Sequence, residues 1–192
     1  PLMLAAKNGN TEIFRCLLEN HAEINAVNNT GASALIFATF YKHSEIIRML
    51  LENNASINIF GALDKGMALM TPLGIAVLDA QFNKNYEIVQ MLLQYGADVN
   101  FPDAEGRIPL HLAGRNSFLI ELLLEKSDIN AVNKRNGKTL LMELSADPFC
   151  EKEHIKTLLE KGANINLEDN NGETALLKSI KCRMNKTGER YD

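Results

Sequence analysis

Residues 71–100 decide how this chain folds, and they read TPLGIAVLDAQFNKNYEIVQMLLQYGADVN. Thr71 can cap the amino-terminus of a helix through its hydroxyl group, and Pro72 suits the first position inside that helix. From Ile88 onward, apolar residues recur at the i, i+3 and i+4 spacing that places them on one face of a second helix. Gly96 then stands where that helix must end in a left-handed residue. The segment therefore predicts two short helices joined by a turn.

The same pattern recurs along the chain. The equivalent leucines of the first helix are Leu2, Leu35, Leu73, Leu110, Leu141 and Leu176, and the spacings between them are 33, 38, 37, 31 and 35 residues. Turns of the Asn-Gly or Glu-Gly type separate the later units. A repeat of about 33 residues with these features resembles the ankyrin repeat family. The resemblance implies an all-α fold, an ankyrin-repeat solenoid of stacked helix–turn–helix units with hairpin-like loops.

The resemblance covers nearly the whole chain, which we expect to form a single ankyrin repeat domain. The predicted repeats span approximately residues 1–31, 32–66, 67–106, 107–137 and 138–172, with part of a sixth over 173–192. The fourth repeat departs most from the family pattern, because Ile108 stands where a capping threonine is usual. Loss of such a cap costs about 1 kcal/mol, so this repeat is expected to be a local weak point. Because the sequence starts and stops inside repeats, we also expect it to be part of a longer protein.

The composition narrows the classes of partner and compartment. Lysine and arginine number 20 against 24 aspartates and glutamates, which gives a net charge of −4 and argues against nucleic acid as the main ligand. The three cysteines are odd in number and far apart, so we expect no disulfide framework and a reducing, cytoplasmic setting. No apolar run approaches the ~20 residues that a membrane-spanning helix needs, so membrane insertion is not expected.

The residues that could carry chemistry are read as structural. No histidine, cysteine or carboxylate group has a recognised metal-ligand spacing, and no glycine-rich phosphate loop occurs, so we expect no metal, cofactor or catalysis. His43 and His111 stand where ankyrin repeats themselves carry histidine. Cys16 aligns with apolar core positions of the other second helices and is expected to be buried and inert. Acidic neighbours of Cys150 oppose formation of its thiolate.

The resemblance implies a protein–protein interaction scaffold, expected to be monomeric, that binds its partner through a concave groove and the hairpin tips. Long ordered loops are often functional, and the turn over residues 60–70 is about five residues longer than usual. The apolar candidates for partner contact are Phe40, Tyr41, Phe60, Leu63, Met67 and Leu78. The alternative is that the loop residues pack back on the edge of the repeats.

A second set of candidates is basic and falls in the fourth and fifth repeats. Its members are Arg107, Arg115, Lys134, Arg135 and Lys138. They suggest a partner with an acidic segment, and binding to such a segment would be sensitive to salt. The alternative is an ordinary solvated rim of charge.

Two further expectations come from the resemblance. In eukaryotic ankyrin proteins the asparagine at the position of Asn100 can be a substrate of an asparaginyl hydroxylase, so Asn100 is the candidate for modification. The array is alternatively the targeting module of a larger enzyme, a bacterial or viral effector that acts on proteins in a host cytosol, or a structural spacer without a specific partner.

Overall fold

The computed structural model describes the backbone of residues 1–187 and the side chains of residues 1–183. Over these residues the regular structure is helical, with only isolated bridges between extended segments, so the predicted all-α class is confirmed. Contacts divide the chain into two compact units, residues 1–104 (unit 1) and residues 105–192 (unit 2). Each unit is built of helix pairs, and in each pair we call the first helix the inner helix and the second the outer helix.

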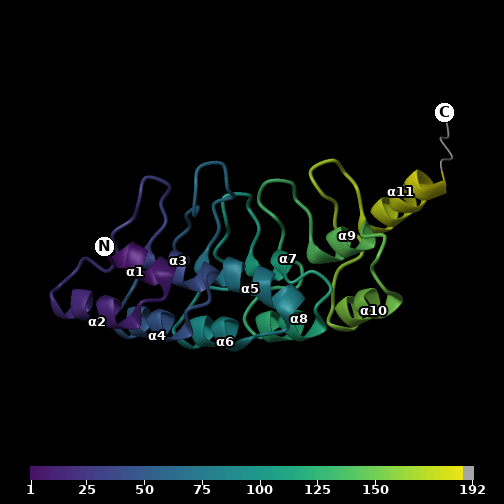
Figure 1. The fold of residues 1–192 in the computed structure, drawn as a ribbon. Coiled ribbons are helices and arrows are strands. Elements are labelled where there is room, and N and C mark those ends of the chain that lie inside the picture. The colour runs from purple at the N-terminus through teal and green to yellow at the C-terminus, as the bar shows by residue number, and fades with distance from the viewer. Residues whose placement is uncertain (188–192) are drawn as a thin grey trace. The chain divides into compact units, whose positions relative to one another are not determined.

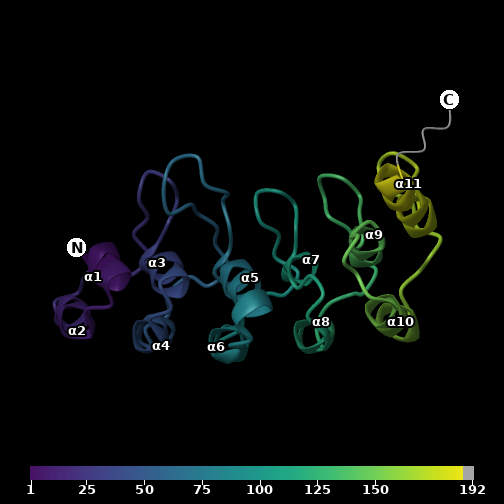
Figure 2. The ribbon, with the colours of Figure 1, turned by 45° about the vertical axis from the view of Figure 1, so that its right-hand side comes forward.

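Unit 1 contains three helix pairs. They are α1 (Leu2–Asn8) with α2 (Thr11–Glu19), α3 (Ala34–Phe40) with α4 (Ser44–Glu52), and α5 (Pro72–Asn83) with α6 (Glu87–Gln94). Within this unit the inner helices α1, α3 and α5 form one row and the outer helices α2, α4 and α6 form a second row (Figures 1 and 2). Neighbouring inner helices pack against each other, and each packs on its own outer helix.

Unit 2 continues the same construction. Its helices are α7 (Pro109–Leu112) with α8 (Ser117–Leu124), α9 (Leu140–Ser145) with α10 (Lys152–Glu160), and α11 (Ala175–Thr187). The inner helix α9 packs against both α7 and α11, and long loops lead into α9 and α11 from the same side of the inner row (Figure 2). Both units therefore have the stacked helix pairs that the repeat pattern predicts.

Hydroxyl caps start most of the inner helices, as the sequence predicts. In each case the capping oxygen accepts a hydrogen bond from the backbone N–H three residues later. The distances are 3.4 Å at Ser33, 2.9 Å at Thr71, 3.3 Å at Thr139 and 3.4 Å at Thr174. These bonds satisfy amide groups that would otherwise lack a partner at a helix start.

The outer helices end in a left-handed residue at equivalent positions. Gly96 has φ of 87°, so the predicted geometry is confirmed there, and Gly162 and Asn54 at the equivalent positions have φ of 90° and 60°. His21 takes the same conformation in the first repeat, with φ of 59°, which the sequence reading missed. Histidine is among the non-glycine residues that adopt this region more often than most.

Asparagines near the ends of the outer-helix segments join successive repeats. The Oδ1 atom of Asn25 accepts a hydrogen bond from the Ser56 backbone N–H at 2.7 Å, and Asn58 accepts one from Asp98 at 2.9 Å. In unit 2, Asn130 accepts the corresponding bond from Asn164 at 2.7 Å. Each of these asparagines follows an isoleucine in its repeat and helps to join that repeat to the next.

The two motif histidines hold backbone groups of neighbouring segments. The Nε2 atom of His43 lies 3.1 Å from the carbonyl oxygen of Lys7, and its ring lies so close to Gly9 that a Cβ there would be 2.5 Å away. In the fourth repeat, Nδ1 of His111 accepts a hydrogen bond from the Ile108 N–H at 3.2 Å. Ile108 itself makes no side-chain cap, as predicted, but the histidine keeps its amide paired.

The prediction that Cys16 is buried is wrong, because its side chain is exposed. The equivalent residue in the third repeat, Met91, is buried. Along the outer row, α2 packs beside α4 on one side only in the described structure, and Ile13 of α2 is exposed as well. Alignment to a core position therefore overestimates burial in the first repeat.

Candidate protein-binding surfaces

The base of the long loop over residues 60–70 is fixed to the preceding hairpin. Gly61 and Met70 exchange backbone hydrogen bonds of 3.1 Å in both directions, and the Ala62 N–H donates to the Thr30 carbonyl oxygen at 3.1 Å. A Cβ on Gly61 would lie 2.5 Å from backbone atoms of Gly31, so only glycine fits this close approach. The loop is therefore ordered at its base.

The tip of this loop is a turn organised by Asp64. Its Oδ1 accepts from the Lys65 N–H at 2.7 Å, and its carbonyl oxygen accepts from the Met67 N–H at 3.2 Å. Met67 and Phe60 are exposed, whereas Leu63 is half-buried. The loop thus packs back at its base and presents apolar side chains to solvent at Phe60 and at the tip.

The other predicted apolar contacts lie at the carboxyl ends of two inner helices of unit 1. Phe40 and Tyr41 end α3 and are exposed, with ring centroids 5.2 Å apart in an edge-to-face arrangement. Leu78, at the equivalent position of α5, is exposed to 37%. The structure thus places these residues on neighbouring helices of one unit.

Phe82 near the end of α5 is 74% exposed and is not among the residues that the sequence predicts for partner contact. A signal was present, because 16 positions separate the cap Thr71 from the outer-helix start at Glu87, whereas 11 separate Ser33 from Ser44. The extra five residues lengthen the inner helix instead of forming a loop.

The basic candidates all lie in unit 2, and several of them already interact within the chain. The guanidinium of Arg115 lies 3.3 Å from an Asp147 carboxylate oxygen and donates to the Phe149 carbonyl oxygen at 2.7 Å. Arg135 forms an ion pair with Glu105. Lys134 is exposed, while Arg107 and Lys138 are half-buried. The local basic excess is therefore smaller than a count of residues suggests.

Glu143 of α9 has a carboxyl group that is influenced by two of the basic residues. Burial raises the pKa of Glu143 to about 7, even though the positive charges of Lys138 and Arg107 act in the opposite direction. Desolvation of the charged form thus outweighs attraction by the two cations. Near neutral pH, Glu143 exchanges between its neutral and its charged form.

A buried ion pair holds the start of α11. The Lys178 ammonium lies 2.5 Å from the Asp169 carboxylate and 2.7 Å from that of Glu173, and the Asp169 side chain is fully buried. The hydrogen bond from Lys178 lowers the pKa of Asp169 to about 2, and backbone N–H groups of Glu173 and Asn171 contribute. Burial opposes the charge of Lys178, but its two carboxylate partners outweigh burial and raise its pKa. This buried ion pair therefore has a structural role.

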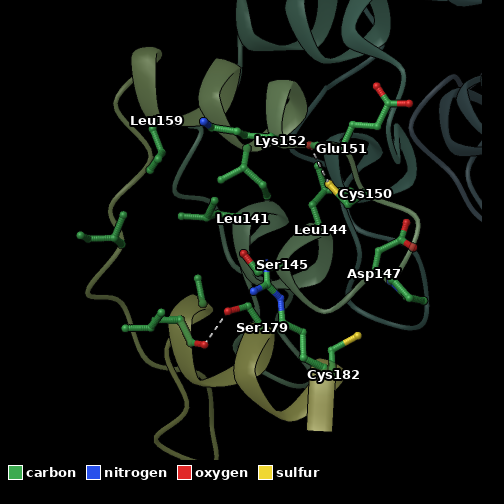
Figure 3. A pocket seen from close by; sticks show the side chains of 16 residues that line it. Leu141, Leu144, Ser145, Asp147, Cys150, Glu151, Lys152, Leu159, Ser179 and Cys182 are labelled. Atoms are coloured by element: carbon green, nitrogen blue, oxygen red, sulfur yellow. Dashed lines mark hydrogen bonds between the residues drawn. The ribbon is translucent and has the colours of Figure 1, made fainter. Parts of the chain in front are cut away.

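A hollow of about 560 Å³ lies in unit 2 beside α9, α10 and α11 (Figure 3). Its lining is mostly aliphatic and includes Leu141, Leu144 and Leu159, with Cys150 and Cys182 also present. Burial raises the pKa of the Cys150 thiol, and the charge of Asp147 raises it further. A thiol in this state is a poor nucleophile, so the hollow has the character of an apolar packing surface.

The described residues hold neither a metal-ligand cluster nor a membrane-spanning helix. No cluster of three or more histidine, cysteine, aspartate or glutamate side chains is arranged to hold a metal ion in the described part of the chain. None of the helices described there has the length and apolar character to cross a membrane. Asn100, the candidate for hydroxylation, is exposed, and its backbone N–H donates to Asp98 Oδ1 at 2.8 Å.

Comparisons with known proteins agree with this architecture. The family model for ankyrin repeats (3 copies) matches residues 1–60, 73–169 and 110–187. Among solved structures, the chain is similar to one from the complex of the Bd0816 predatory endopeptidase of Bdellovibrio bacteriovorus with immunity protein Bd3460. The identity is 26%, the TM-score is 0.78, and the match covers 96% of this chain and 92% of that chain. Because the family matches span most of the sequence, the chain belongs to the ankyrin repeat family.

Proposed function

We propose that this chain is a protein–protein interaction scaffold that binds its partner through the inner-helix surface and the hairpin tips, the concave groove of the family's fold, and that this region performs no catalysis. The observation that carries the proposal is the set of exposed apolar side chains in unit 1, on α3, α5 and the long loop. Exposed apolar groups that gather on one surface are typical of binding sites. The acidic segment of the partner and the monomeric state belong to the same proposal.

The experiment compares capture of a partner by two forms of the purified chain. One is the wild type, and the other carries Phe40→Ala, Tyr41→Ala, Lys134→Glu and Arg135→Glu. A partner recovered from the native source should bind the wild type at least tenfold more tightly than the variant. Equal affinity for both forms would contradict binding through these surfaces and favour a spacer role.

A more specific candidate function is that of an immunity protein that binds an endopeptidase. The similarity to a chain of the Bd0816–Bd3460 complex, over 92% of that chain, favours it. Purified chain titrated into an assay of Bd0816 should lower peptidase activity with a 1:1 end point. Unchanged activity at a large excess of the chain would remove this candidate and leave the general scaffold role in place.

The remaining proposals concern the cellular compartment of the chain, the sequence that adjoins it and its modification. The three cysteines are unpaired, which is compatible with the reducing, cytoplasmic setting that we propose. The targeting-module and effector alternatives differ in what adjoins the array, and a full-length reading frame separates them. Exposure of Asn100 is compatible with hydroxylation, and mass spectrometry of native protein without a 16-Da increase on its peptide would argue against this modification.

A further inference from the structure

The inner helix of the third repeat carries an exposed phenylalanine on an extension. Helix α5 has 12 residues, whereas α3 has 7, and the additional turn ends with Phe82 and Asn83. Full burial of a phenylalanine side chain is worth about 1.5–3 kcal/mol, and a side chain exposed to 74% gains little of this on folding. Folding of the repeat therefore gives no reason for a phenylalanine at this position.

Packing and hydrogen bonds hold the extension in place. Ala80 is fully buried beneath it, and the chain leaves the helix at Lys84 in a left-handed conformation whose N–H donates to the Ala80 carbonyl oxygen at 3.0 Å. The Asn83 amide donates to Asp79 at 2.8 Å, and Asp79 also pairs with Lys42 of the neighbouring repeat at 2.8 Å. Phe82 is thus presented on a fixed element, which lowers the entropy cost of using it in binding.

Other apolar side chains share this surface. Leu78 lies four residues before Phe82, so the two occupy the same face of α5. On the adjacent helix α3, Phe40 has the position equivalent to that of Leu78, and the rings of Phe40 and Tyr41 pack edge to face. We call Phe40, Tyr41, Leu78 and Phe82 the aromatic surface.

The ends of the inner helices beside the aromatic surface are rich in lysine. Lys7, Lys42 and Lys84 are exposed at the ends of α1, α3 and α5, and Lys42 pairs with Asp79, so Lys7 and Lys84 are the lysines left to meet a partner. The acidic side chains of Glu12, Glu45 and Glu87 lie in the first turns of the outer helices. The Lys7 ammonium lies 5.9 Å from the ring centroid of Tyr41. Lysines at helix carboxyl ends are favoured by the helix dipole, but the dipole gives no reason for Phe82.

We propose that Phe82 is the principal anchor of the aromatic surface, and that its partner is a protein segment in which apolar side chains are flanked by carboxylates. The inference rests on the proposed scaffold function and assigns the main contact to unit 1. Apolar contact with Phe82 and Leu78 supplies affinity, and pairing with the lysines supplies orientation and salt sensitivity.

The probe for this inference is a phage-displayed library of random 16-residue peptides, selected on the immobilised intact chain. We expect the enriched peptides to combine aspartate or glutamate with leucine, phenylalanine or tryptophan. A labelled peptide from the selection, measured by fluorescence anisotropy, should bind Phe82→Ala at least tenfold more weakly than the wild type. The matched control is Phe149→Ala in unit 2, where the phenylalanine is exposed to 72%, and it should change affinity less than twofold.

Two further measurements complete the test. Raising NaCl from 50 to 300 mM, or the double change Lys7→Glu with Lys84→Glu, should weaken binding severalfold, with far-ultraviolet circular dichroism unchanged in every variant. Unchanged affinity of Phe82→Ala, an equal loss in Phe149→Ala, or peptides without acidic residues would each overturn the inference. If the selected peptides lose affinity only when Met67, or Lys134 and Arg135, are changed, the scaffold proposal stands and the assignment of Phe82 as anchor fails. If no peptide is enriched on the wild type, the result counts against both the scaffold proposal and the Phe82 assignment.

Discussion

Two equivalent positions of the repeat carry apolar residues in unit 1 and mostly charged residues in unit 2. The positions are the residue before the inner-helix cap and the fourth residue after that cap. In unit 1 they are apolar, with Ala32 and Phe37 in the second repeat and Met70 and Ile75 in the third. In unit 2 most are charged: Arg107 with Leu112, Lys138 with Glu143, and Glu173 with Lys178.

The difference shows that stacking constrains these positions only weakly. Phe37 and Ile75 are buried, and so is the charged Lys178. Lys178 remains charged because two carboxylates lie within hydrogen-bonding distance, whereas burial raises the pKa of Glu143 more than the nearby cations Lys138 and Arg107 lower it. The same repeat architecture thus accommodates apolar residues at these positions in one unit and charged residues in the other.

The largest effect is expected at Lys178. Lys178→Met leaves Asp169 buried without its cation, and breaking a buried pair in this way costs about 3–5 kcal/mol. Urea denaturation followed by circular dichroism should show the loss at pH 7. The pKa of Asp169 is lowered in the folded chain, so its contribution is present above about pH 4 and disappears as pH falls toward 2.

The control is the double change Lys178→Met with Asp169→Asn, which removes both charges. It should be less destabilising than Lys178→Met alone. If Lys178→Met alone lowered the free energy of unfolding by under 1 kcal/mol, the charge at this position would not contribute to the stability of unit 2.

A smaller, pH-dependent effect is expected at Glu143. Its folded pKa of about 7 exceeds the ordinary value of 4.5, so the folded chain retains a proton that the unfolded chain loses, and stability falls as pH rises through this range. Glu143→Gln imitates the protonated form and should stabilise the chain by about 1–2 kcal/mol at pH 8. At pH 4 the two proteins should be nearly equal in stability. A difference independent of pH would show that the carboxyl group is not desolvated.

Unit 1 offers a stabilising change at a buried hydroxyl. Among the described residues, Thr39 Oγ1 is buried without a hydrogen-bond partner, and the equivalent residue of the next repeat is the fully buried Val77. An unsatisfied buried polar group costs about 1–3 kcal/mol, so Thr39→Val should stabilise the chain by about 1 kcal/mol. The control is Thr157→Val, because Thr157 donates to the Glu153 carbonyl oxygen at 2.9 Å and gains nothing from the change. Equal effects at both sites would contradict the explanation.

The local features of this fold were predictable because they depend on neighbours in sequence. A capping hydroxyl at Thr71 and a left-handed Gly96 act within three or four residues, and both are confirmed. Arg135, in contrast, pairs with Glu105 thirty residues away, and no local pattern identifies that partner. The exposure of Cys16 likewise depends on which helices lie beside α2.

The surface of unit 1 was only partly predictable for a related reason. Phe40 and Leu78 occupy positions that the repeat pattern defines, so the sequence identified them. Phe82 lies in an insertion, where the repeat pattern gives no register. Its position follows only once the insertion is known to extend α5.

The smallest effect is expected at Ile108, where the sequence alone predicts a weak helix start. Ile108→Thr restores a capping hydroxyl, which elsewhere is worth about 1 kcal/mol. Here the gain should be under about 0.5 kcal/mol, because the His111 backbone N–H that a threonine hydroxyl would bind already donates to the Ile108 carbonyl oxygen at 3.0 Å, and the change removes apolar surface from a side chain that is only 4% exposed. The same change in a His111→Ala background should have a similar effect, because the hydroxyl at position 108 and the His111 side chain serve different amide groups. Denaturation of the four proteins of this cycle measures the coupling, and strongly non-additive effects would contradict this assignment of the two hydrogen bonds.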